Sequence, residues 1–308
     1  MENPDLPAGG VVAAVDGSPS STRAVAWAVD QAVVENRPLV LAHGMGPVES
    51  HWMGQSAGID HRALLAARRA EARRVMDAAR AQVAARAPDL VAHEALLAQD
   101  PRELLIGLSS HAAMLVLGSH GRGPVTSLLL GSVSVAVTKH AACPVVVVRP
   151  RRAEEPSGGV LVGTDGTERS RQTLEFAHRQ ASLRELPLTI MHCYWDARSA
   201  FQSARVRRGD AAPGPDVEEV RLLVAESLAE LADRFPEVDV RVELVHGWAD
   251  DCLIEGSKKM DLVVVGTHRR RALEAIVYGS VAFSVLEHAG CVVAVVPGPV
   301  DESRPEPA

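Results

Sequence analysis

The motif Gly118-Ser119-His120-Gly121 is the most informative feature of this 308-residue chain. Gly131-Ser132-Val133 follows it after a further nine residues. The pattern returns 148 positions later as Gly266-Thr267-His268-Arg269 and, again after nine residues, Gly279-Ser280-Val281. In each copy a short turn leads into the predicted start of a helix. Backbone N–H groups in such turns and at helix starts bind phosphate well. The two copies therefore predict two related domains, with Arg269 standing where the first copy has Gly121.

Short apolar segments alternate with segments of helical spacing in both halves. Most are near-continuous runs of Val and Leu, as expected of parallel strands covered on both faces. This alternation predicts an α/β fold with a parallel sheet and right-handed crossovers in each half. The predicted strands are residues 11–15, 39–43, 91–98, 114–118 and 145–149, and then 160–164, 188–193, 238–245, 262–266 and 292–296. The predicted helices of the first half are residues 20–35, 62–86, 101–110 and 131–141.

The length of the chain fits two domains of ordinary size. A segment rich in Pro, Glu and Gly separates the two halves, and the end of the chain is polar and rich in Pro. We therefore expect a first domain at 1–150, a linker at 151–159, a second domain at 160–298 and a disordered tail at 299–308.

The overall charge limits the classes of partner. A net charge of −7 argues against nucleic acid or an anionic membrane as the main partner, because both require a basic face. No apolar run approaches the length of a membrane span, and the acidic N-terminus does not resemble a secretory signal. The sequence thus predicts a cytoplasmic protein.

Cysteine and histidine give no metal signature. The four cysteines, Cys143, Cys193, Cys252 and Cys291, form no CxxC pair, which argues against a zinc ribbon or a thioredoxin-like site. Cys143 and Cys291 occupy equivalent positions of the repeat and are expected to be small buried residues. The twelve histidines lack metal-ligand spacing within either half. We therefore predict no metal site, other than magnesium carried by a nucleotide.

An aspartate follows the first predicted strand of each half, in Asp16-Gly17-Ser18 and Asp165-Gly166-Thr167. A side chain at the carboxyl end of a parallel strand projects into the crevice where ligands bind in open α/β sheets. The alternative is an Asx turn or a helix N-cap with no ligand. Recurrence of the same triplet in both halves favours a binding role.

The glycines of the repeated stretch have two possible explanations. Gly118 and Gly121 can adopt unusual backbone geometry and bring the main chain close to a ligand. Ser132 and Ser134 can add hydroxyl donors at the helix start. The alternative is a tight loop with no ligand. No GxxxxGK[ST] motif is present, which excludes a P-loop nucleotide hydrolase.

These motifs resemble the nucleotide-binding type of the universal stress protein family. The resemblance rests on Gly-x2-Gly-x9-Gly-Ser and on the segment His140-Ala-Ala-Cys143-Pro144 with the valines after it, and it extends over nearly the whole chain. It implies two tandem Rossmann-like domains, each a five-stranded parallel sheet of order 3-2-1-4-5 flanked by helices. It also implies ATP as the ligand, with Mg²⁺, and a homodimer or pseudo-dimeric packing of the two domains through the edges of their fifth strands.

The resemblance assigns nucleotide-binding positions in both halves and implies no catalytic residue. In the first half they are Ala14, Asp16, His43, Gly44, Gly118, Ser119, His120, Gly121, Arg122, Gly123, Gly131, Ser132 and Val133. In the second half they are Gly163, Asp165, His192, Cys193, Gly266, Thr267, His268, Arg269, Arg270, Gly279, Ser280 and Val281.

Arg269 departs from the family pattern, which has glycine there. Its side chain could obstruct the approach of the triphosphate or contact a phosphate through two hydrogen bonds. The arginine run 269–271 could equally be solvated.

Three functions follow from the sequence. The leading one is an ATP-binding stress-response regulator that is not an enzyme, since no Walker lysine or general-base pair is evident. The alternatives are a slow ATPase or autophosphorylating enzyme, and a nucleotide-free dimeric interaction protein.

Overall fold

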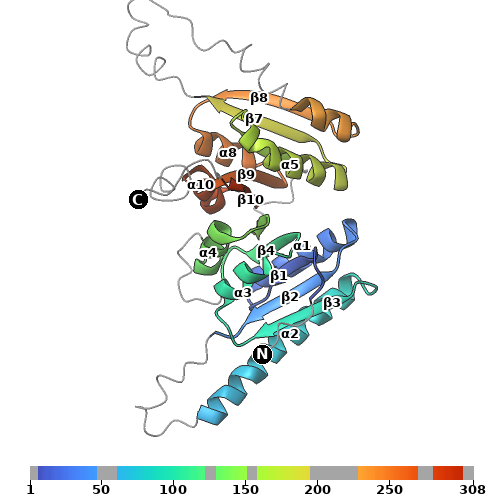
Figure 1. Ribbon diagram of the computed structural model, residues 1–308, viewed down its shortest axis with the longest axis vertical. Helices are drawn as coiled ribbons and strands as arrows, with labels where there is room; N and C mark the ends of the chain where they lie inside the picture. Colours follow the sequence, from blue (N-terminus) through green and yellow to red (C-terminus); the bar gives the residue numbers. More distant parts are fainter. Residues whose placement is uncertain are drawn as a thin grey trace, which may run out of the picture. The chain divides into compact units, whose positions relative to one another are not determined.

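The computed structural model describes residues 6–46, 61–121, 130–150, 158–194, 228–269 and 280–300. The chain divides into two compact units, Met1–Pro150 and Arg151–Ala308, which we call the first and second units. Each unit contains five parallel strands and flanking helices (Figure 1), so the predicted α/β class is confirmed. Within the described residues, none of the helices is long and apolar enough to cross a membrane.

The first unit has the strand order β3-β2-β1-β4-β5. Its strands are β1 (Val11–Ala14), β2 (Leu39–Gly44), β3 (Ala92–Leu97), β4 (Met114–Gly118) and β5 (Val145–Val148). Helices α1 (Pro19–Val34) and α2 (His61–Arg86) pack together on one face, and α3 (Pro101–Leu108) and α4 (Ser132–His140) on the other (Figure 1). Strand β1 pairs with both β2 and β4, so the direction of winding reverses between β1 and β4.

The core of this unit is built from its strands. Val11, Leu39, Leu41 and Leu115 are fully buried, because helices cover both faces of the sheet. This burial explains why the strands read as continuous apolar runs rather than alternating ones.

Helices α1 and α3 begin where the sequence predicts. The Ser18 side chain caps α1 by accepting a hydrogen bond from the Ser21 N–H. Asp100 caps α3 in the same way by accepting from the Arg102 N–H at 2.8 Å, and proline follows each cap. The Arg102 guanidinium bonds the same carboxylate and lowers the pKa of Asp100 to about 2. Helices α1 and α3 thus each begin a few residues after the carboxyl end of a strand, β1 and β3 respectively.

The second unit repeats this order as β8-β7-β6-β9-β10. Its strands are β6 (Val160–Thr164), β7 (Leu188–Tyr194), β8 (Val240–His246), β9 (Leu262–Arg269) and β10 (Val292–Val300). Helix α5 (Arg171–Leu183) lies on one face, and α8 (Ala249–Ser257) and α10 (Ser280–His288) lie on the other (Figure 1). Strands β9 and β10 continue beyond the predicted ends at 266 and 296.

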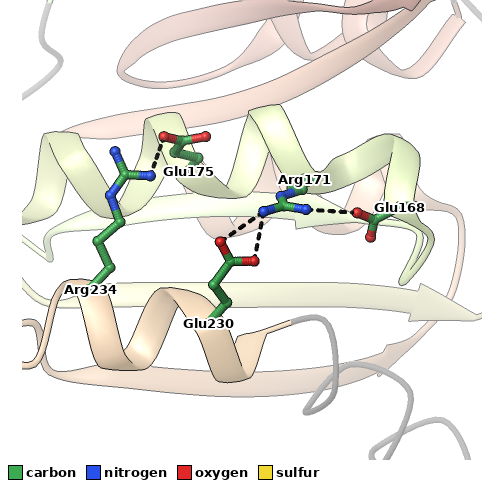
Figure 2. A network of polar contacts seen from close by, with 5 residues as sticks. All are labelled: Glu168, Arg171, Glu175, Glu230 and Arg234. Atoms are coloured by element: carbon green, nitrogen blue, oxygen red, sulfur yellow. Dashed lines mark hydrogen bonds and ion pairs between the residues drawn. The ribbon is translucent and has the colours of Figure 1, made fainter.

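A network of ion pairs joins α5 to a helical segment at residues 228–234 (Figure 2). Arg171 bonds both carboxylate oxygens of Glu230, at 2.8 and 2.6 Å, and also reaches Glu168. Arg234 bonds Glu175 at 2.6 Å. All five side chains are substantially exposed. Exposed ion pairs contribute little to the free energy of unfolding. Burial of the Leu231 side chain therefore contributes more to holding this helical segment in place.

Candidate functional site

A cavity of about 370 Å³ opens at the carboxyl ends of β1 and β4. This is the point in the first unit where the winding direction reverses, which is where ligands bind in open α/β sheets. Its volume falls in the range of small-molecule sites. The cavity is lined by Ala14, Val15, Asp16, Ser21, Ala42, His43, Gly44, Pro101, Leu105, Leu117, Gly118, His120, Gly121, Leu130, Gly131, Ser132, Val133 and Ser134.

The two sides of this cavity differ in chemistry. The side formed by the end of β2 and by α3 is mainly apolar, with Ala42, Pro101 and Leu105. The side formed by the segment after β4 and the start of α4 carries glycines, hydroxyl groups and helix N–H groups. A ligand with a flat apolar part and an anionic part would match both sides.

His43 is fixed by a hydrogen bond at the end of β2. Its Nδ1 lies 2.5 Å from the carbonyl oxygen of Val15, which can only accept, so Nδ1 carries the proton. In the neutral form of this tautomer, Nε2 is the acceptor. His192 repeats the arrangement in the second unit, with Nδ1 at 3.1 Å from the Thr164 carbonyl oxygen.

Asp16 makes the predicted Asx turn and also lines the cavity. Its Oδ1 accepts from the Ser18 N–H at 2.8 Å, which makes the Asx turn that precedes α1. Its carboxylate also lines the cavity, and Oδ2 lies 2.9 Å from the position of an ideal Cβ at Gly121. The turn thus holds a carboxylate against the segment that follows β4.

Two glycines of the repeated stretch have close neighbours within the protein, backbone at Gly118 and the end of a side chain at Gly121. A Cβ at Gly118 would lie 2.7 Å from the carbonyl carbon of Ser20 in α1, and one at Gly121 would meet Asp16. Neither glycine has a positive φ, so the expectation of unusual backbone geometry at Gly118 and Gly121 is wrong. Their close approach is to other parts of the protein.

Gly131 differs from these two glycines. A Cβ there would lie 3.5 Å or more from its nearest neighbours, which is ordinary contact. Gly131 is the N-cap of α4, and it provides no side-chain cap to the helix N–H groups. The first turn of α4 also contains no acidic residue. A helix N-terminus whose N-cap residue provides no side-chain cap therefore faces the cavity, and its first N–H groups carry partial positive charge.

The serines near this helix have different roles. The Ser134 hydroxyl donates to the Gly118 carbonyl at 2.9 Å and is buried, so it holds α4 against β4. Its predicted role as a ligand donor is therefore wrong for this arrangement. Ser119 is fully buried beside His120 and does not line the cavity. The exposed Ser132 makes no hydrogen bond to the described residues.

The cavity brings together most of the positions predicted in the first half. They are Ala14, Asp16, His43, Gly44, Gly118, His120, Gly121, Gly131, Ser132 and Val133. Arg122 and Gly123 lie outside the described residues. The sequence reasoning missed the apolar lining: Val15, Ala42, Pro101, Leu105, Leu117 and Leu130, together with Ser21. Ala42 pairs with Ala14, so strand register was the signal that could have identified it.

The second unit follows a different backbone path at the corresponding place. Strand β9 continues through Thr267 to Arg269 and pairs with β10 as far as Val300, across an irregularity. In the first unit β4 ends its pairing with β5 at Gly118. The Gly131 N–H bonds the Ser119 carbonyl at 2.8 Å. Residues 119–121 thus lie outside the strand in the first unit, whereas Thr267 to Arg269 belong to β9 in the second.

The remaining positions of the second unit are only partly described. Asp165 is exposed, and its Oδ1 accepts from Thr167 and Ser170. Leu253 of α8 packs directly on Gly163, and Thr173 of α5 on Gly266. Val281 lies in α10. The side chains of His268, Arg269 and Ser280, and all of Arg270 and Gly279, lie outside the described part of the chain.

Cysteines and possible metal ligands were also located. Cys143 and Cys291 are buried, as predicted, and burial raises the pKa of the Cys143 thiol to about 12. Within the described ranges, no group of three or more His, Cys, Asp or Glu side chains could hold a metal ion.

Comparison with known proteins identifies relatives along the whole chain. The model of the universal stress protein family matches residues 10–149 and again 158–297. A universal stress protein of Mycolicibacterium smegmatis is 32% identical over 297 residues, covering 93% of this chain and 96% of its own. One of Mycobacterium tuberculosis is 33% identical over 302 residues, with the same coverage. The solved structure of a universal stress protein from Archaeoglobus fulgidus covers 96% of this chain and 98% of its own, with a TM-score of 0.68 and 17% identity, and it shows the same fold.

Proposed function

Because this chain belongs to the universal stress protein family, we propose that it is a stress-response regulator whose first unit binds ATP with Mg²⁺. Bound nucleotide would stabilise one arrangement of the helices around the cavity, and a partner would recognise that arrangement. The observation that supports this most directly is Gly131, because no steric contact with the described residues requires a glycine there.

The base and sugar would occupy the apolar side of the cavity, beside β2 and α3. Gly44 allows the end of β2 to pack closely on the start of α3 at this side, since a Cβ at this residue would lie 2.7 Å from the Cα of Pro101. Main-chain groups at the end of β2 and the Nε2 acceptor of His43 offer polar contacts to a purine.

The phosphates would lie against the start of α4. A bare glycine at the N-cap allows an oxyanion to approach the first N–H groups of the helix, and the hydroxyl of Ser132 adds a donor. The described lining contains no lysine or arginine, so Mg²⁺ would supply the positive charge. The Asp16 carboxylate is the group in this lining that suits it.

Paired substitutions of two glycines test the proposal. Gly131→Val should weaken ATP binding at least tenfold in calorimetric titration, because the side chain would cover the N–H groups of α4. Gly107→Ala is the matched control: it lies in α3, and an added Cβ there meets nothing within 4 Å. The control should keep the affinity of the unmodified chain. Equal affinities in all three proteins, or no binding by the unmodified chain, would exclude this site.

A second candidate function depends on Ser132. It is the exposed hydroxyl of the cavity that makes no hydrogen bond to the described residues, so it could accept a phosphoryl group in an autophosphorylating protein. Incubation with radiolabelled ATP distinguishes the two functions. A label that Ser132→Ala abolishes supports this second candidate, and the absence of label in the unmodified chain supports the regulator.

The resemblance to the family also implies self-association through the fifth strands. We propose a homodimer or a pseudo-dimeric packing of the two units, and light scattering with and without ATP measures the mass of the assembly.

A further inference from the structure

Two cysteines of the second unit lie together at the carboxyl end of its sheet. Cys193 is in β7, and its thiol neighbours that of Cys252 in α8. The Sγ of Cys252 lies 2.9 Å from the position of an ideal Cβ at Gly247, whose N–H bonds the carbonyl of Tyr194 at 3.1 Å. This chain of contacts holds the Cys252 sulfur beside the last residues of β7. Both side chains are partly exposed, so a small reagent can reach them.

The pair is particular to the second unit. His43 and His192 each bond a carbonyl 28 positions earlier, so the residues that follow them, Gly44 and Cys193, correspond. Ser109 and Ser257 each bond a carbonyl three positions earlier and an N–H 33 positions later. This correspondence places Leu104 of the first unit opposite Cys252. The first unit therefore has Gly44 and Leu104 where the second has two thiols.

The pair lies at the place in the second unit that corresponds to one side of the first unit's cavity. Gly44 lines that cavity on the side formed by β2 and α3. Cys193 and Cys252 occupy the equivalent side in the second unit, on β7 and α8. A bond between them would join this strand to this helix.

We propose that Cys193 and Cys252 are a peroxide-sensitive dithiol that oxidises to a disulfide joining β7 to α8. Neighbouring thiols on a strand and on the helix packed beside it can approach to the S–S bond length of about 2.05 Å. Cysteines buried alone, such as Cys143 and Cys291, lack such a partner thiol among the described residues. The pair is thus chemically distinct from the two packing cysteines.

The reaction needs one molecule of hydrogen peroxide. The Cys252 thiolate attacks one peroxide oxygen, breaks the O–O bond and forms a sulfenic acid, while the other oxygen leaves as hydroxide and takes up a proton to become water. The Cys193 sulfur then attacks the sulfenic sulfur, and its proton leaves with the displaced hydroxide as a second water. The two thiols lose two electrons, which the peroxide gains.

The environment of the two sulfurs supports this order of attack. Burial, and then the neighbouring Cys252, raise the pKa of the Cys193 thiol to about 12. Cys193 therefore stays protonated at neutral pH. Thiolate is the nucleophilic form, which disfavours Cys193 as the first nucleophile.

Peptide mapping of the full chain tests the proposal. After treatment with equimolar hydrogen peroxide, maleimide counting under denaturing conditions should fall from four thiols to two. Non-reducing digestion should yield a peptide that links Cys193 to Cys252, and dithiothreitol should reverse both results. A count that stays at four, or a link through Cys143 or Cys291, would overturn the proposal, and neither result depends on a variant.

Variants then separate the two steps. Cys252→Ser should leave three thiols and no link, whereas Cys193→Ser should leave a sulfenic acid at Cys252 that dimedone traps. A Cys143→Ala/Cys291→Ala double variant is the matched control and should form the link at the rate of the unmodified chain. Trapping at Cys193 in the Cys252→Ser variant, with none at Cys252 in the other, would contradict the order of attack.

Discussion

The Oδ2 of Asp16 lies 2.9 Å from the point that a Cβ atom at Gly121 would occupy. Asp16 closes the turn before α1, and Gly121 belongs to the segment after β4, so two separate parts of the sequence meet at this contact. The glycine at 121 is therefore explained by a neighbouring carboxylate, whether or not a ligand is bound.

A double-mutant cycle measures this relationship. Gly121→Ala should force the Asp16 carboxylate out of its turn, whereas Asp16→Ala removes the obstacle. The two substitutions should therefore be non-additive, with a coupling of about 0.5–3 kcal/mol in the free energy of unfolding. Urea titration of the four proteins provides the values. Strict additivity would show that the carboxylate moves away freely.

Gly118→Ala should destabilise the protein as a whole. Its Cβ would lie 2.7 Å from the Ser20 backbone, which cannot move without displacing α1, so overpacking should cost about 1–3 kcal/mol. A role limited to phosphate binding would instead leave the fold intact. Thermal unfolding distinguishes the two outcomes, and Gly107→Ala is a suitable control because glycine is unfavourable within a helix.

Arg269→Gly should not create a site equal to that of the first unit. Arg269 is part of β9 and pairs with Val300, so removing its side chain leaves an extended backbone at this position. Calorimetric titration should give the same number of tight ATP sites before and after the change. A gain of one tight site would contradict this prediction.

The helical segment at 228–234 should depend on its buried leucine more than on its ion pairs. Leu231→Ala should lower the free energy of unfolding by about 2–5 kcal/mol, because it removes buried methyl groups. Arg171→Ala breaks the contacts with Glu230 and Glu168 (Figure 2) but should leave the thermal midpoint nearly unchanged, since these groups are exposed. Both midpoints can be measured by calorimetry, and a larger effect of Arg171→Ala would reverse this ranking.

His178 should make stability depend on pH. It is buried in α5, where Nδ1 bonds the Leu174 carbonyl, and burial lowers its pKa. Because the unfolded state then binds the proton more readily, the contribution is fully present above about pH 6.5 and declines as pH falls. His178→Leu should reduce the slope of stability between pH 7 and 5. His111→Gln, at an exposed position, should keep that slope.

The secondary structure was largely predictable because its causes are local. Short apolar segments, most of them near-continuous, indicated the strands of the described ranges, and Asp100-Pro101 indicated the start of α3. The ends of β9 and β10 were not predictable, since pairing between them, rather than the residues themselves, extends both strands. The glycine pattern likewise indicated the place of the cavity but not its apolar lining, which comes from neighbouring strands and α3.

The sequence by itself determined the tandem α/β architecture, the repeat and the positions that gather at the strand ends. These follow from apolar periodicity and from the spacing of glycines along the chain. Tertiary structure decided what each glycine does: Gly118 and Gly121 accommodate Ser20 and Asp16, whereas Gly131 faces open space. It also brought Cys193 beside Cys252. The physical reason is that steric requirements and thiol contacts depend on neighbours that only folding brings within a few ångströms.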